Sequence, residues 1–153
     1  MFRMSVLCRG AAALAAAACT NQPAVPQEAR TAMPDSQLTV SLATDKPRYA
    51  PGEPITFTLT ARNGGSQPVT LHFSSGQRYD FTFDDAGGRT VWRWSADKAF
   101  IQVLGDETLT AGGALVYRER FEERLVPGMY RITGMVTAMG GALRATATVA
   151  VGP

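Results

Sequence analysis

The 153-residue sequence predicts an all-β fold, a single antiparallel immunoglobulin-like β-sandwich of about seven to nine strands. Three observations support this prediction. From residue 37 onward, apolar and polar residues alternate with a period of two. Turn-forming residues recur between these runs at the spacing of short strands. No segment shows a 3.6-residue period of useful length, so no helix is expected. A small β-barrel is the structural alternative.

Turn residues separate the predicted strands. The prolines and Gly52 of DKPRYAPGEP turn the chain, Asn63-Gly64-Gly65 ends a strand, and DDAGGR at 84–89 forms a hairpin loop. We expect strands over residues 38–42, 55–61, 69–73, 79–83, 91–94, 100–104, 115–121, 130–138 and 143–151.

Residues 1–18 predict an export signal outside the fold. Arg3 and Arg9 provide its positive start, and the alanine-rich run that follows is shorter than the about 20 residues of a membrane-spanning helix. Cys19 follows three alanines, which resembles a bacterial lipobox, although the usual leucine three residues earlier is absent. We therefore expect a lipid on Cys19. An ordinary cleavage site beside a cysteine is the alternative.

Residues 19–36 contain three prolines and little apolar content, which predicts a flexible tether before a folded domain at 37–153. An unanchored leader fits the same composition. With the lipid, the chain is expected to be an exported, membrane-anchored lipoprotein of the bacterial cell envelope. Cys8 lies within the signal, so the domain contains no internal disulfide and depends on packing.

The charge of the chain excludes one class of partner. The sequence has 15 Lys and Arg against 13 Asp and Glu, and removal of Arg3 and Arg9 balances the two signs. A nucleic-acid-binding domain presents a clustered basic patch, which this sequence lacks. The mixed-sign run RERFEERL predicts a solvated strand of the kind that protects a sheet edge; a charged recognition face is the alternative.

No catalytic site is expected, so the protein is predicted not to be an enzyme. His72, Ser74, Ser75 and Asp80 offer the residue types of a hydrolytic triad, but His72 and Ser74 point from the same face of one strand. The DDAGG loop could bind calcium, but turn formation is the better interpretation, because backbone requirements alone explain its Asp and Gly residues. No metal, cofactor or small-molecule substrate is predicted.

The segment 73–100 contains both tryptophans. In a strand over 91–94, Trp92 and Trp94 share one face. Inside the sandwich they would anchor the core, and outside it they would form an aromatic patch for a partner. We expect them inside. Arg78, Arg93 and Lys98 lie close enough in sequence to stack on these aromatic rings.

Five blocks in order resemble the BsuPI-type intracellular proteinase inhibitor family from about Leu38 to Val151. They are LTVSLATDKPRYAPGEPITFTLT, PVTLHFSSGQRYDF, VWRWSADKAF, LTAGGALVYRERF and VPGMYRITG, of which SSGQRYDF and VWRWS are the most specific. The resemblance implies an immunoglobulin-like β-sandwich that inhibits serine proteinases. Together with the export signal and the lipid expected on Cys19, it predicts a non-enzymatic, envelope-anchored protein-binding module. The alternative is a structural or assembly lipoprotein whose sandwich binds another envelope protein.

The resemblance places the candidate partner-binding residues in two blocks. An inhibitor must enter a proteinase cleft with an extended loop, and Ser75–Arg78 and Ser95–Phe100 are the candidates. The full set of candidate residues is Ser75, Gly76, Gln77, Arg78, Trp92, Trp94, Ser95 and Lys98.

Overall fold

A computed structural model of the chain describes residues 31–32, 37–141 and 143–152. The predicted export signal at 1–18, Cys19 and most of the predicted tether lie outside the described residues. Thr31 and Ala32, which belong to the predicted tether, form the short strand β1 and pair with β2.

The prediction of an all-β fold is confirmed, because the described residues form eleven strands and no helix. Two of these strands, β1 and β3, are only two residues long and account for the excess over the predicted number. The strands are β1 (Thr31–Ala32), β2 (Leu38–Thr44), β3 (Arg48–Tyr49), β4 (Ile55–Asn63), β5 (Val69–Phe73), β6 (Tyr79–Asp84), β7 (Thr90–Arg93), β8 (Gly105–Leu109), β9 (Ala114–Phe121), β10 (Gly128–Val136) and β11 (Leu143–Val151).

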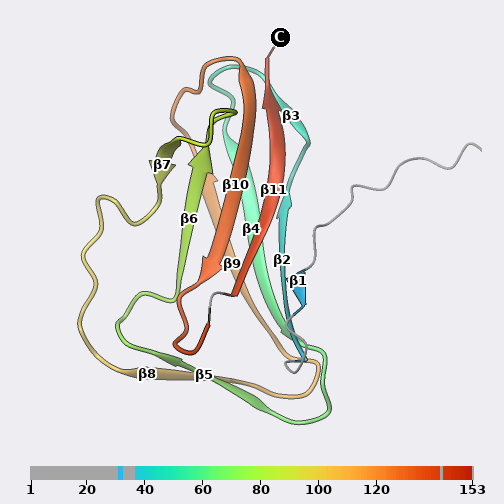
Figure 1. The fold of residues 1–153 in the computed structure, drawn as a ribbon, viewed down its shortest axis with the longest axis vertical. Coiled ribbons are helices and arrows are strands. Elements are labelled where there is room, and N and C mark those ends of the chain that lie inside the picture. Colours follow the sequence, from blue (N-terminus) through green and yellow to red (C-terminus); the bar gives the residue numbers. More distant parts are fainter. Residues whose placement is uncertain (1–30, 33–36, 142, 153) are drawn as a thin grey trace, which may run out of the picture.

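Two sheets face each other, as Figure 1 shows. One has the strand order β1-β2-β4-β9 and the other has the order β3-β11-β10-β6-β7. Strands β5 and β8 form a separate two-stranded ribbon at the lower end of the view. None of the described residues forms a helix long and apolar enough to cross a membrane.

The sandwich is not purely antiparallel. Strand β3 pairs in parallel with β11, with Arg48 opposite Ala150 and Tyr49 opposite Val151. The turn at Ala50–Glu53 follows β3 directly. The parallel pairing places the buried Tyr49 side chain at the end of the core. That turn has Pro51 and a positive-φ Gly52 at its centre, the combination that a type II turn requires.

The strand predicted over residues 100–104 is wrong. These residues form no strand, and the strand instead covers Gly105–Leu109, where β8 pairs with β5. The apolar residues Ile101, Val103 and Leu104 favour a strand, but all three are exposed, and the segment has no partner strand among the described residues. The strand predicted over 91–94 also ends one residue early, so Trp94 begins a turn.

The core lies between the inner faces of the two sheets. Its centre is an aromatic cluster in which Phe57 of β4 contacts Phe81 of β6, and Phe83 stacks on Phe121 of β9 with ring centroids 4.7 Å apart. Trp92 packs edge-on against this cluster. Such pairs add to the free energy of apolar burial, so this cluster connects the two sheets.

The β6–β7 hairpin is built by Asp85. Its Oδ1 accepts hydrogen bonds from the backbone N–H groups of Gly87 and Arg89, each at 3.0 Å, and Gly88 has a φ of 80°. These bonds hold the pKa of the Asp85 carboxyl below its ordinary value. The turn interpretation of DDAGGR is therefore confirmed.

Candidate functional site

The two loops predicted as partner-binding lie next to each other. The backbone N–H of Gly76 donates a 2.8 Å hydrogen bond to the carbonyl of Ile101, which directly follows the second loop. A Cβ at position 76 would lie 3.0 Å from Ile101 Cγ1, so a glycine permits this close approach. The pairing brings residues 75–78 and 95–101 to one side of the molecule.

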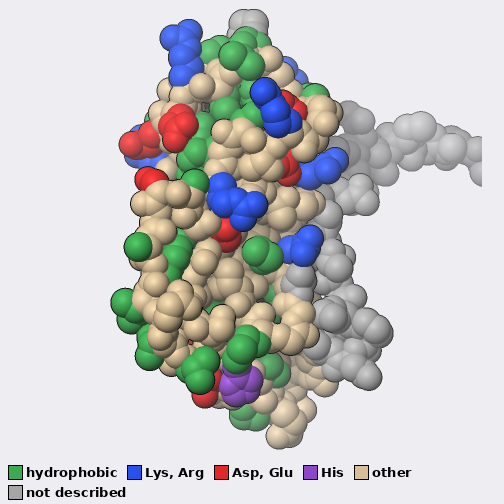
Figure 2. Space-filling view, turned by 60° about the vertical axis from the view of Figure 1, so that its left-hand side comes forward, with side chains coloured by type: hydrophobic (Ala, Val, Ile, Leu, Met, Phe, Trp, Pro, Cys, Tyr) green, Lys and Arg blue, Asp and Glu red, His purple; other side chains and the backbone are tan. Residues whose placement is uncertain are grey.

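Residues 101–104, hereafter the apolar segment, form the most exposed aliphatic stretch of this region. The side chains of Ile101, Val103 and Leu104 are 72%, 50% and 75% exposed. The long connection that contains them runs from β7 to β8 beside the two sheets (Figure 1). Figure 2 shows hydrophobic side chains gathered at the lower end of the molecule, around the single histidine. Exposed aliphatic clusters of this kind mark contact sites.

Trp94 supports the loop that precedes the apolar segment. Its ring lies 4.4 Å from the ring of Tyr79 and 5.9 Å from that of Phe100, between centroids. Lys98 Nζ lies 4.7 Å from the Trp94 ring centroid, within the range of a cation–π contact. Both Trp94 and Lys98 therefore pack within the loop and support it.

Asp80 of β6 fixes the start of the same loop. The residue is 4% exposed, and its carboxylate accepts hydrogen bonds from Ser95 Oγ at 2.7 Å and from the Ser95 N–H at 3.2 Å. Arg93 Nη1 adds an ion pair at 3.2 Å. A buried carboxylate needs such donors, and they tie the Ser95 turn to the sheet.

Arg78 supports the C-terminal end of the apolar segment. Its Nη1 donates to the Ser75 carbonyl at 2.6 Å, its guanidinium lies 4.5 Å from the Phe73 ring centroid, and Nε faces Glu107 Oε1 at 3.5 Å. A Cβ at position 105 would lie 2.4 Å from Arg78 Nη2, so Gly105 leaves the space that the guanidinium occupies. Arg78 thus braces the loop from within.

The remaining candidate residues also have internal contacts. Gln77 Nε2 donates to the Tyr79 carbonyl at 3.1 Å, and the Gln77 carbonyl accepts from Thr137 Oγ1 at 2.8 Å. Trp92 points toward the core cluster. The structure therefore brings Ser75–Arg78 and Trp94–Lys98 together as the support of an exposed segment. Sequence reasoning missed Ile101, Val103 and Leu104 as surface residues, because FIQVL has the composition of a buried strand.

Comparison with known families decides the class of the protein. The family model described as "BsuPI: Intracellular proteinase inhibitor" matches residues 42–141. The chain belongs to the BsuPI family. The match includes both candidate loops and the apolar segment. Membership of a family of inhibitors, and not of enzymes, suggests a proteinase-inhibitor-like protein whose partner is a proteinase. No curated protein matches the chain.

Among the solved structures similar to this BsuPI-family chain, one supports the fold alone. The C-terminal domain of Wzt has a TM-score of 0.52 at 9% identity, over 84% of this chain and 80% of that domain. The Pseudomonas fluorescens alkylpurine DNA glycosylase AlkC has a TM-score of 0.47 at 16% identity over 78% of this chain. A Listeria innocua β-glucosidase has 0.46 at 14% identity, also over 78%. The chain spans only 31% and 16% of these two enzymes.

The single histidine of this BsuPI-family chain pairs with an aspartate on the β5–β8 ribbon. His72 Nδ1 lies 2.8 Å from Asp106 Oδ1 across the β5–β8 ribbon, both side chains are exposed, and within the described residues His72 has no hydrogen bond to Ser74 or Ser75. No group of three or more His, Cys, Asp or Glu side chains in the described part of the chain is placed to hold a metal.

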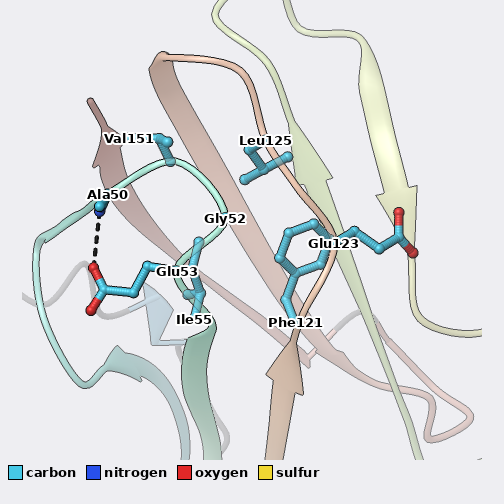
Figure 3. Close-up of a pocket in the computed structure, with 8 residues that line it drawn as sticks. All are labelled: Ala50, Gly52, Glu53, Ile55, Phe121, Glu123, Leu125 and Val151. Atoms are coloured by element: carbon cyan, nitrogen blue, oxygen red, sulfur yellow. Dashed lines mark hydrogen bonds between the residues drawn. The ribbon is translucent and has the colours of Figure 1, made fainter. Parts of the chain in front are cut away.

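Figure 3 shows a gap at the end of the sandwich near the Ala50–Glu53 turn. Ile55, Phe121, Leu125 and Val151 form its apolar floor, while the Glu53 carboxylate turns to accept the Ala50 N–H at 2.9 Å. The gap is too narrow to hold a water molecule, so it is a packing feature of the core and not a binding site.

Proposed function

We propose that this chain is an inhibitor of serine proteinases that presents the apolar segment, residues 101–104, to the proteinase. One observation supports this proposal above the others: three large aliphatic side chains within four residues are exposed on a segment that has no partner strand. Family membership supplies the class of partner. Burial of one such side chain in a partner pocket contributes about 1.5–3 kcal/mol before the costs of association.

The support of the segment favours tight binding. Trp94 and Asp80 hold the loop before the segment, the Gly76 N–H contacts it at Ile101, and Arg78 braces the chain beyond it. A loop that is already ordered loses less conformational entropy on binding than a flexible one. An inhibitor needs this property, because a flexible loop in a proteinase cleft is a substrate.

The proposal also includes an immunoglobulin-like type for the sandwich, which the two facing sheets of short strands support. It further includes export and a lipid on Cys19, which rest on the sequence pattern alone. In that setting the target is a proteinase of the cell envelope. The competing function is a structural or assembly lipoprotein that binds another envelope protein.

The test is a titration of the full chain against a panel of serine proteinases. Residual activity is measured at rising inhibitor ratios, and mass spectrometry follows cleavage of the chain in parallel. We expect stoichiometric inhibition of at least one proteinase without rapid cleavage. Digestion of the chain without inhibition of any proteinase would contradict the proposal and would favour the assembly function.

Variants locate the binding segment. Leu104→Asp and Ile101→Asp are expected to weaken inhibition by at least about tenfold, since a carboxylate cannot enter an apolar pocket without loss of hydration. Val126→Asp is the matched control, because Val126 is an equally exposed aliphatic residue, at 72%, in the β9–β10 connection. Equal effects of Leu104→Asp and Val126→Asp would place the contact outside the apolar segment.

A further inference from the structure

A depression of about 200 Å³ lies on the outer face of the five-stranded sheet. Its lining comes from outward-facing residues of β6, β7, β10 and β11 and includes no residue of the apolar segment. Figure 2, which brings the β7 side of the molecule forward, shows basic side chains over the middle and upper part of the surface, with carboxylate atoms between them. The lining residues are Asp80, Thr82, Arg93, Thr133, Met135 and Arg144.

The register of the sheet explains how these residues meet. Thr82 of β6 lies opposite both Arg93 of β7 and Thr133 of β10, and Met135 lies opposite both Asp80 and Arg144. These residues form two neighbouring rows across β7, β6, β10 and β11. Arg93 lies at one side and Arg144 at the other, with Thr82 and Thr133 between them. Side chains on a strand alternate between faces, so the rows project outward while Phe81 and Ile132 point into the core.

The side chains that line the depression offer more hydrogen-bond donors than acceptors. Its one carboxylate, Asp80, is already occupied by Ser95, by Arg93 Nη1 and by the Phe81 N–H at 2.9 Å. Within the described residues, Arg144 has no ion pair or side-chain hydrogen bond, and neither have the hydroxyls of Thr82 and Thr133. A guanidinium has five N–H donors and no acceptor. The lining has one negative and two positive side chains.

We propose that this depression binds a small oxyanion, the phosphate or carboxylate group of a small molecule. A ligand rich in acceptors matches two guanidinium groups and two hydroxyls, and a negative charge offsets the excess positive charge of the lining. The ion pair with Asp80 holds Arg93 at the rim while its side chain stays 51% exposed, and within the described residues only Nη1 of its guanidinium has a hydrogen-bond partner. A partly ordered arginine binds at a smaller entropic cost.

The test is a ¹H–¹⁵N NMR titration of the full chain with sodium phosphate and with sodium acetate. A sodium chloride titration at matched ionic strength and constant pH separates binding from screening. We expect saturable shifts for the amides of residues 80–82, 133–135 and 144 with phosphate or acetate, and none with chloride. The stronger of the two anions identifies the preferred head group.

Three variants make the assignment specific. Arg144→Gln and Thr133→Val remove donors that do not hold Asp80, so the fold is expected to persist in both. Arg144→Gln should weaken binding by at least about tenfold. The matched control is Arg118→Gln, an exposed arginine on β9 of the other sheet. Chloride shifts equal to those of both anions, or equal losses in Arg144→Gln and Arg118→Gln, would overturn the proposal. Proteinase inhibition is not part of this readout.

Discussion

The Tyr79 hydroxyl donates a 2.6 Å hydrogen bond to Glu119 Oε1 and so connects β6 of one sheet to β9 of the other. The Tyr79 ring also lies between Trp94, at 4.4 Å, and Tyr117, at 4.5 Å. Burial and the Glu119 carboxylate raise the pKa of Tyr79 above its ordinary value. One side chain therefore joins the two sheets to the loop that supports the apolar segment.

Tyr79→Phe should lower the free energy of unfolding by about 1–2 kcal/mol. The ring and its packing remain, but Glu119 loses a charge-assisted hydrogen bond in a half-buried position. Urea denaturation followed by tryptophan fluorescence measures the change. In a double-mutant cycle with Glu119→Ala, the two losses should be less than additive by at least about 0.5 kcal/mol. Strict additivity would show that the bond contributes nothing.

Asn63→Ala should cost about 2–3 kcal/mol of stability. The Asn63 side chain is fully buried, and its Nδ2 faces the carbonyls of Gln67, Leu109 and Thr110 at 2.7–3.2 Å, while Oδ1 accepts from Gly65. Truncation removes the hydrogen bonds of Asn63 to these three carbonyls and to the Gly65 N–H. Thermal and urea unfolding measure the loss. Arg62→Ala, at the exposed neighbouring position, is the control and should change stability by less than about 0.5 kcal/mol.

Alternation of residue types predicts the strands that have one buried face. Strand β4 is the clearest case, with Ile55, Phe57 and Leu59 buried and the intervening threonines less so. The same rule fails at 100–104, because alternation describes side chains and contains no information about whether a partner strand is present. Strands β1 and β3 are too short to produce a pattern, so the parallel contact of β3 had no signal in the sequence.

The candidate site was predictable only in part. The BsuPI resemblance and the aromatic residues indicate 75–78 and 92–98, of which 75–78 and 94–98 lie together in the structure, whereas Trp92 packs on the core. Their role depends on contacts between residues distant in sequence, such as Asp80 with Ser95 and Arg78 beside Gly105, and no local pattern encodes these. The exposed face of the region consists of aliphatic residues that composition alone assigns to the core.

Gly134→Ala should destabilise the protein by about 1–3 kcal/mol through overpacking. Gly134 is buried on the inner face of β10, and a Cβ there would lie 2.9 Å from Leu59 Cδ1 and 3.0 Å from Phe81 Cε1. Because Phe81 belongs to the aromatic core, the ring has little room to move. Gly152→Ala is the matched control, since nothing lies within 4 Å of its added Cβ. A Gly134→Ala variant as stable as Gly152→Ala would show that the core relaxes freely.

Stability should fall as the pH rises above about 10, and Tyr49 should account for part of that fall. Burial and the 2.6 Å hydrogen bond to Asp45 Oδ1 raise the pKa of Tyr49 to about 12. Between the unfolded-state and folded-state pKa values, the unfolded chain loses the Tyr49 proton while the folded chain keeps it. The stabilisation is therefore complete below about pH 10 and decreases toward pH 12.

The measurement is the urea midpoint from pH 8 to 11.5 for the wild-type chain and for Tyr49→Phe. Tyr49→Phe should be less stable at pH 8, because Asp45 loses the hydroxyl donor that helps to keep its pKa low against the effect of burial. It should also lose less stability with rising pH, so the two curves converge. Parallel curves would mean that Tyr49 has the same proton affinity in the folded and unfolded chains, contrary to its buried contact with Asp45.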